Sequence, residues 1–145
     1  MAKIAALFTS SAEGADPTPI DSARPNEKGA LEGDRHRGKP GRKILMVDGA
    51  ILDELGLEPG ALREQITVEG LPELDSLQPG MKLEVGDSTL EIVKACAPCL
   101  TIGALNKVED PEAFRDALEG RRGMFVEFVG DGTKISVGDQ VAVLD

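Results

Sequence analysis

The chain has 145 residues and a formal net charge of −10, and it contains neither Trp nor Tyr. This length suits one domain, residues 1–145, with a largely aliphatic core. An acidic chain with few aromatic rings lacks the charge and the stacking surfaces that nucleic-acid binding needs, so we expect neither nucleic acid nor an anionic membrane among its partners.

The N-terminal segment Met1–Phe8 holds an apolar run that is too short for a secretory signal, and no stretch reaches the length of a transmembrane helix. We therefore expect a cytoplasmic protein. In that compartment thiols stay reduced, so Cys96 and Cys99 are not expected to form a structural disulfide.

The first third of the chain predicts one strand followed by loops. Residues Lys3–Thr9 read as the strand. Residues Ser10–Asn26 are rich in Ser, Pro, Asp and Ala and predict a loop. A second long loop, Gly29–Gly41, contains four glycines and a basic cluster, and loops of this length often carry function or lack fixed structure.

The middle of the chain predicts strands around one short helix. Residues Arg42–Asp48 contain four consecutive apolar residues and predict a strand buried on both faces. Helical spacing marks Gly49–Leu57, and Ala61–Glu64 suits a further helical turn. Residues Gln65–Glu69 alternate as a strand does, and Leu71–Gly80 is a turn-rich connection.

Two alternating segments, Met81–Val85 and Thr89–Val93, flank Gly86-Asp87-Ser88 and predict a β-hairpin. Asp110 suits the N-cap of a helix over Pro111–Leu118. Three more strands are expected after it: Met124–Val129, Ile135–Val137 and Val141–Leu144. Many short strands and few short helices predict a mainly β fold, either a barrel or a sandwich.

The two cysteines lie in the segment Lys94–Leu100, directly after the predicted hairpin. A thiolate is a nucleophile and a soft metal ligand, and the nearby Lys94 favours its formation at Cys99. Three other interpretations stay open: a packed, inert cysteine, a dithiol redox pair with Cys96, or half of a zinc site.

The segment Gly33–Lys43 concentrates basic side chains and glycines in an acidic chain. Glycines let backbone N–H groups approach an oxyanion, and arginine donates two parallel hydrogen bonds to phosphate or carboxylate. The segment therefore predicts an anion-binding loop or, alternatively, a solvated basic loop. His36 also suits a structural role, Arg122 suits the C-terminal end of a helix, and Arg63 suits plain exposure to solvent.

Taken together, these pieces resemble one protein family. The matching segments are Gly33-Asp34-Arg35-His36-x-Gly38, Arg63–Leu71, Leu77-x-x-Gly80-x-x-Leu83-x-x-Gly86, Pro98-Cys99, Arg121–Met124 and Gly138-Asp139-x-Val141. In this order and spacing they resemble the MOSC domain, which is named for the C-terminal domain of molybdenum cofactor sulfurases. The resemblance runs from about residue 29 to the C-terminus.

The resemblance implies a closed or partly open MOSC-type β-barrel that binds the pyranopterin molybdenum cofactor or carries sulfur for it. Cys99 would be a molybdenum ligand or would hold a persulfide. The residues implied to contact the cofactor are Arg35, His36, Arg63, Gln65 and Arg122. A cysteine desulfurase or a molybdoenzyme would be its protein partner.

The sequence departs from the family pattern in two places: Gln65 stands where the family usually has Asn, and Cys96 is additional to the shared cysteine. Cys96 could resolve a persulfide on Cys99 or simply pack. No lysine lies in a context that suits pyridoxal phosphate, so sulfur would have to come from another protein.

Three functions remain open from the sequence. The first is a cofactor-binding or sulfur-carrier protein that acts through Cys99. The second is an enzyme that uses the molybdenum cofactor to reduce N-hydroxylated compounds. The third is a dithiol redox module in which Cys96 and Cys99 matter equally.

Overall fold

The computed structural model describes residues 1–10, 16–34, 42–130 and 132–144. Within these ranges the strands are β1 (Lys3–Thr9), β2 (Thr18–Ile20), β3 (Ser22–Ala23), β4 (Ile44–Asp48), β5 (Ile66–Glu69), β6 (Lys82–Val85), β7 (Ser88–Ala95), β8 (Met124–Phe128), β9 (Ile135–Ser136) and β10 (Val141–Leu144). The helices are α1 (Gly49–Glu54), α2 (Leu100–Leu105) and α3 (Pro111–Ala117), with a 3₁₀ turn, η1 (Leu74–Ser76). The predicted mainly β fold with a few short helices is confirmed.

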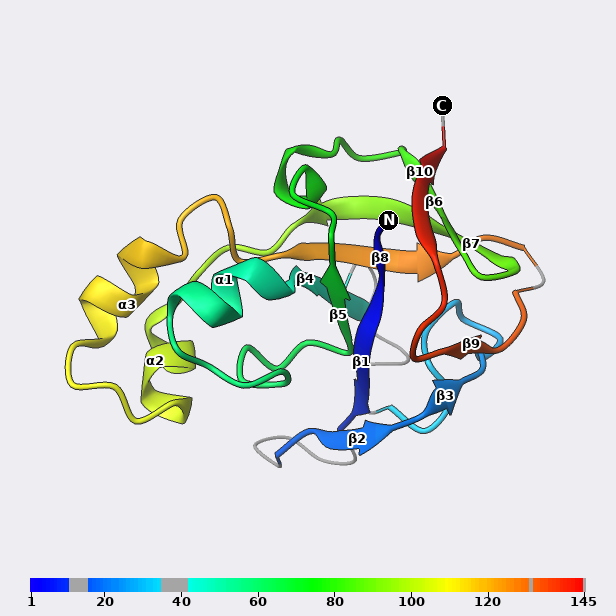
Figure 1. Ribbon diagram of the computed structural model, residues 1–145. Helices are drawn as coiled ribbons and strands as arrows, with labels where there is room; N and C mark the ends of the chain where they lie inside the picture. Colours follow the sequence, from blue (N-terminus) through cyan, green and yellow to red (C-terminus); the bar gives the residue numbers. More distant parts are fainter. Residues whose placement is uncertain (11–15, 35–41, 131, 145) are drawn as a thin grey trace.

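Eight strands form one curled sheet in the order β10-β6-β7-β8-β4-β5-β1-β2, and β3 pairs with β9 beside it (Figure 1). Only the β4–β5 pair in the sheet is parallel among the described strands. The predicted hairpin is confirmed as β6 and β7, with Val85 opposite Ser88 across the turn. Neither β2 nor β3 was predicted, because short edge strands of Thr, Pro, Ser and Ala carry no apolar periodicity.

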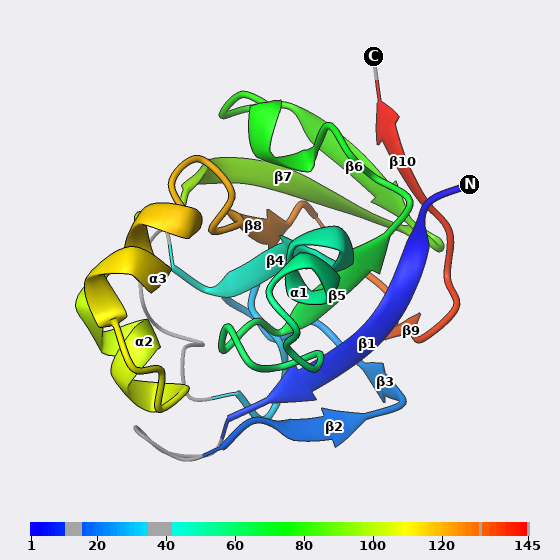
Figure 2. The same cartoon turned by 60° about the vertical axis from the view of Figure 1, so that its left-hand side comes forward.

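Backbone hydrogen bonds join the two ends of the curled sheet. The Ile4 N–H donates to the Asp139 carbonyl and the Gly138 N–H donates to the Ile4 carbonyl, each at 2.9 Å. The Val141 N–H donates to the Ala2 carbonyl at 2.9 Å. Figures 1 and 2 both show the start of β1 beside the segment that leads into β10. These bonds close the sheet into the barrel-like shape that was expected.

Strand β4 lies between two hydrophobic clusters, as its apolar run predicted. Ile44 and Met46 face the main core inside the curled sheet. Leu45 and Val47 face the other way, into a smaller cluster with residues of α1 and α2. Because successive strand residues point to opposite faces, one five-residue strand supports both the barrel core and the helical side of the molecule.

Helices α2 and α3 pack side by side at one end of the sheet (Figure 2). Asp110 caps α3 as predicted, because its Oδ1 accepts from the Ala113 N–H at 3.1 Å. Helix α2 follows Cys99 directly and was not predicted. None of the helices in the described ranges is long and apolar enough to cross a membrane.

Candidate functional site

Strand β7 carries the cysteine segment to the helical side of the molecule. The strand ends at Ala95, and the Cys96 N–H still donates to the Gly123 carbonyl at 2.9 Å, just before β8 begins. Cys99 has extended backbone geometry and is the N-cap residue of α2. The loop between β7 and α2 is therefore anchored at both ends, and the two cysteines fall at different depths in it.

The two thiols have different environments. Cys99 is exposed, whereas Cys96 is partly buried. Burial raises the pKa of the Cys96 thiol, and the charge of Cys99 raises it further, while Arg122, Arg42 and Lys94 lower it. Cys99 is therefore one of the charged groups that act on the Cys96 thiol.

Cys96, and not Cys99, lines a cavity of about 270 Å³. Its wall is made by the end of β7, the loop after it, the turn before β8 and η1; the lining residues are Asp75, Ala95, Cys96, Ala97, Pro98, Glu119, Gly120, Arg122 and Gly123. The volume lies near the lower end of the range for small-molecule pockets, which is about 300–1,000 Å³. The cavity can therefore hold a small anion or one end of a larger ligand.

Arg122 is the buried cation of this cavity. The residue is only 7% exposed, and its Nε and Nη1 atoms have no hydrogen-bond partner within the described parts of the chain. An unsatisfied buried donor costs about 1–3 kcal/mol, and more when it is charged. An anion in the cavity would remove part of that cost.

Asp75 places a carboxyl group in the same cavity. Its Oδ1 accepts from the Gly123 N–H at 3.1 Å. Burial raises the pKa of Asp75, and the negative charge of Asp48 adds to the effect, while the hydrogen bond from Gly123 and the charge of Arg121 lower it. Sequence analysis missed Asp75 because it stands in the turn-rich connection 71–80, and nothing in that pattern places it beside a cysteine 21 residues away.

Arg63 lies on a tight loop that follows α1. The residue has a positive φ of 63°, and its N–H donates to the Gly60 carbonyl at 2.9 Å. The buried Glu64 carboxylate fixes this loop by accepting from the Gly60 N–H, the Leu62 N–H and the Thr67 hydroxyl at 2.7–3.1 Å. The loop is thus a turn held by a carboxylate, and not the helical turn predicted over 61–64.

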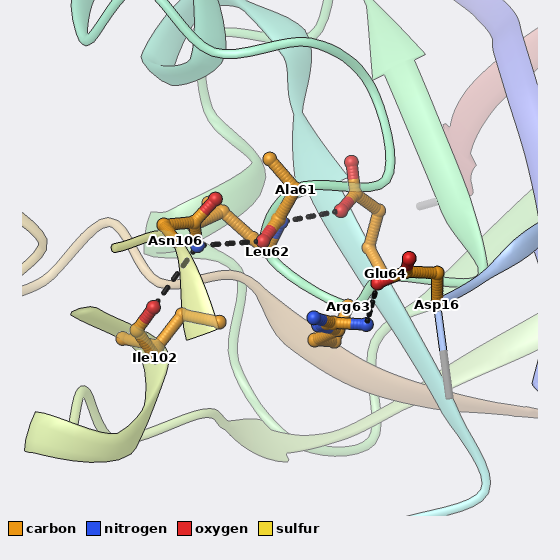
Figure 3. Close-up of polar contacts among 7 residues, drawn as sticks. All are labelled: Asp16, Ala61, Leu62, Arg63, Glu64, Ile102 and Asn106. Carbon is orange, nitrogen blue, oxygen red and sulfur yellow. Dashed lines mark hydrogen bonds and ion pairs between the residues drawn. The ribbon is translucent and has the colours of Figure 1, made fainter. Parts of the chain in front are cut away.

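The Arg63 loop is joined to the helix that follows Cys99. Asn106 Nδ2 donates to the Ala61 carbonyl at 2.9 Å and to the Ile102 carbonyl at 3.0 Å (Figure 3). The Nη1 atom of Arg63 lies 3.3 Å from the Oδ1 atom of the exposed Asp16. Tertiary structure therefore ties the Arg63 segment to α2, although 36 residues separate Arg63 from Cys99.

Gln65 has a structural place in the barrel wall. The side chain is 4% exposed. Its Oε1 accepts from the Leu45 N–H at 2.7 Å, and its Nε2 donates to Asp34 Oδ2 at 3.4 Å. Asp34 in turn accepts from the Ser10 N–H at 2.8 Å. This amide bridges β4 to the start of the basic loop, so it positions that loop while its role as a cofactor contact stays a prediction.

Arg35 and His36 lie outside the described residues. The two ends of their loop are described: Asp34 is tied to Gln65, and Arg42 lies near enough to Cys96 to lower the pKa of that thiol. The charge of Arg42, at the C-terminal end of the basic loop, therefore acts on the cysteine segment. Among the described residues, no three His, Cys, Asp or Glu side chains gather as a metal site would require.

Comparison with known proteins identifies the family. The MOSC domain model matches residues 33–142, which is more than half of the chain. A search of curated protein sequences finds no match.

Similar solved structures share the fold at low sequence identity. The YuaD protein from Bacillus subtilis is 20% identical with a TM-score of 0.83, over 99% of this chain and 96% of that one. YiiM from Geobacillus stearothermophilus is 16% identical with a TM-score of 0.73, over 100% of this chain and 76% of that one. YiiM from Escherichia coli is 17% identical with a TM-score of 0.70, over 99% and 70%. With the family model and this shared fold, the chain belongs to the MOSC domain family.

Proposed function

We propose that this protein binds the pyranopterin molybdenum cofactor, or carries sulfur destined for it, through the thiol of Cys99. The observation that supports the proposal most directly is that Cys99 is exposed beside a cavity that contains the buried guanidinium of Arg122. Membership of the MOSC family relates the chain to molybdenum-cofactor chemistry in general.

The residues around the cavity suit this ligand in two respects. A thiolate is a soft ligand that matches a sulfur-rich metal centre. A guanidinium whose Nε and Nη1 lack partners suits an oxyanion such as a phosphate group. When bound, the cofactor would supply redox chemistry at molybdenum. The chain's own residues would hold the ligand: Cys99 by its sulfur, and Arg122 by charge.

The size of the cavity limits how the ligand would lie. A volume of about 270 Å³ accommodates only part of a pyranopterin cofactor. The remainder would extend over the surface towards the basic loop, whose Arg42 end lies near Cys96. Arg35 and His36 belong to that loop, and Arg63 lies on a segment tied to α2. All three remain candidate contacts in this proposal.

Native mass spectrometry of protein purified from a molybdopterin-producing host tests the proposal. We expect the wild-type protein to carry pterin and molybdenum, or one added sulfur atom, and the Cys99→Ser variant to lose pterin and molybdenum and to carry much less added sulfur. Thr101→Ser, an equally small change at an exposed position of α2, is the matched control and should load as the wild type does. Equal loading of Cys99→Ser, or an empty wild-type protein, would contradict the proposal.

The dithiol module predicted as an alternative has one observation in its favour, the electrostatic influence of Cys99 on Cys96. Its arrangement differs from that of the usual redox pair, in which the first cysteine starts a helix. Here the second cysteine is the N-cap residue. Under this alternative, replacing either cysteine would abolish disulfide exchange to the same extent, and neither pterin nor added sulfur would be found.

A further inference from the structure

We propose that Cys96 is a second sulfur-carrying thiol, which receives a sulfane sulfur atom from Cys99 and holds it in the cavity beside Arg122. This inference rests on the sulfur-carrier form of the proposed function. It assigns Cys99 the role of accepting sulfur from a donor and Cys96 the role of storing it away from solvent.

The two thiols differ in their accessibility to a donor. Cys99 is exposed and is absent from the cavity wall, whereas Cys96 is partly buried and lines it. A large persulfide donor, such as another protein, can therefore reach the sulfur of Cys99 much more easily than that of Cys96. A persulfide that remained on Cys99 would be exposed to solvent, where any thiol can attack it.

The cavity around Cys96 also contains a positive charge. Arg122 is 93% buried, two of its nitrogen atoms have no partner in the described parts of the chain, and its charge acts on the Cys96 thiol. A persulfide is anionic and carries its charge on the outer sulfur atom, one bond further into the cavity than a thiolate. An anionic sulfur group on Cys96 would compensate the buried guanidinium, which forms no ion pair with an acidic side chain of the described residues.

Two acidic residues, Asp75 and Glu119, also line the cavity wall. Glu119 is exposed, so water screens its charge. Asp75 is partly buried, its pKa is raised, and it accepts a backbone hydrogen bond from Gly123. A carboxyl group with a raised pKa carries less negative charge at mildly acidic pH and so repels an anion less.

The transfer step is a thiol–persulfide exchange. The Cys96 thiol passes its proton to the outer sulfur of the Cys99 persulfide anion, and the Cys96 sulfur then attacks that protonated outer sulfur. The bond between the outer sulfur and Cys99 Sγ breaks, and Cys99 leaves as a thiolate. One S–S bond forms and one breaks, so no oxidant or reductant is consumed, and the sulfur originally comes from a persulfide donor. Both cysteines lie in the segment between the end of β7 and the start of α2, with two residues between them, and the charge of Cys99 acts on Cys96.

The test uses glutathione persulfide as a bulky donor and inorganic polysulfide as a small one, with tandem mass spectrometry to locate the added sulfur. In the wild-type protein we expect the sulfur on Cys96 after loading by either donor. In Cys99→Ser, loading by glutathione persulfide should slow by about tenfold or more, while polysulfide still loads Cys96. In Cys96→Ser, sulfur should load on Cys99 at the wild-type rate and be removed faster by cyanide.

Variants of the adjacent arginines test the role of charge. Arg122→Gln should lower the ratio of sulfur on Cys96 to sulfur on Cys99 about tenfold, the effect expected when a charge-assisted contact is lost. Arg122→Lys retains the charge and should restore most of that ratio. Arg121→Gln is the matched control: Arg121 is paired with Glu54 and does not line the cavity, so its replacement should change the share of sulfur on Cys96 much less than Arg122→Gln does.

Three results would overturn the inference. Sulfur that stays on Cys99 in the wild-type protein is the first, and this result requires no variant. The second is a Cys96→Ser variant that loses sulfur no faster than the wild type. The third is release of hydrogen sulfide with formation of a Cys96–Cys99 disulfide, which would mean attack on the inner sulfur atom. In each case a Cys99 that loads would leave the proposed function standing, whereas a Cys99 that neither loads nor binds pterin would refute that function itself.

Discussion

Single side chains determine the chemistry of the cavity beside Cys96. Arg122 supplies a buried positive charge, Asp75 a carboxyl group with a raised pKa, and Cys96 a thiol with a raised pKa. Two of these residues bond to the backbone of one glycine: the Gly123 N–H donates to Asp75, and the Gly123 carbonyl accepts from the Cys96 N–H.

The first prediction concerns the pH dependence conferred by Asp75. Because its pKa in the folded protein lies above the ordinary value of 3.8, the native state binds this proton more tightly than the unfolded chain does. The protonated Asp75 carboxyl group therefore adds to the free energy of unfolding. This contribution is complete below pH 3.8 and is lost as the pH rises through the pKa of Asp75 in the folded protein. An Asn side chain does not titrate, so in Asp75→Asn this pH-dependent loss of stability is absent. The Asn amide oxygen can still accept the hydrogen bond from the Gly123 N–H.

We expect the free energy of unfolding of Asp75→Asn, relative to the wild type, to become more favourable as the pH rises from 3.5 to 7, as measured by urea denaturation at each pH. Asp116→Asn, at an exposed position of α3, is the control and should show no such trend. A difference that is constant with pH would mean that Asp75 has an ordinary pKa.

At the scale of elements, the approach of β8 to β4 depends on Gly123. This residue has a φ of 108°, and a Cβ atom there would lie 2.6 Å from the Met46 carbonyl oxygen and 2.9 Å from Val47. Only glycine allows β8 to begin so close to β4. The Gly123 carbonyl also accepts the hydrogen bond from the Cys96 N–H. Gly123 therefore affects both the packing of β8 on β4 and the position of Cys96 in the cavity wall.

The second prediction follows from this contact. Gly123→Ala should lower the free energy of unfolding by about 3 kcal/mol or more, because backbone strain adds to a clash with a buried carbonyl. Gly120→Ala is the matched control: its φ is also positive at 74°, but no atom lies within 4 Å of its Cβ position. The control should cost about 1–2 kcal/mol, and equal costs in thermal or urea unfolding would contradict the argument.

At the scale of the whole molecule, closure of the barrel joins the two ends of the chain. Val141 is 4% exposed, packs in the main core, and donates through its N–H to the Ala2 carbonyl. The same segment bonds to β6 through the Gly86 N–H and the Gln140 carbonyl. A substitution that weakens the packing of β10 should therefore weaken the backbone hydrogen bonds near both β1 and β6.

The third prediction tests this coupling. Val141→Ala should lower the free energy of unfolding by about 2 kcal/mol through lost burial. It should also speed amide hydrogen exchange at Ile4 and Gly86. Leu144→Ala, at the partly exposed end of the same strand, should change stability by less than about 1 kcal/mol and leave both amides protected. Faster exchange at Gly86 alone would mean that the β1 contact does not depend on β10.

The sequence by itself determined the elements with strong periodicity: the β6–β7 hairpin, the doubly buried β4, the capped helix α3, and the family motifs that led to the MOSC family. These features depend on interactions between residues near in sequence, or on motifs that a single chain displays. It also drew attention to the cysteine segment and to Arg122.

Only the tertiary structure decided the depth of each thiol and the composition of the cavity. The sequence does not show which of the two cysteines is buried, yet Cys96 lines the cavity and Cys99 is exposed to solvent. Asp75, Arg122 and Cys96 come together because β7 and β8 pair in register and Gly123 lets β8 approach β4. Burial and electrostatic coupling arise from contacts between residues far apart in the chain. Periodicity in the sequence reports only on residues that are close along the chain, so it does not predict such contacts.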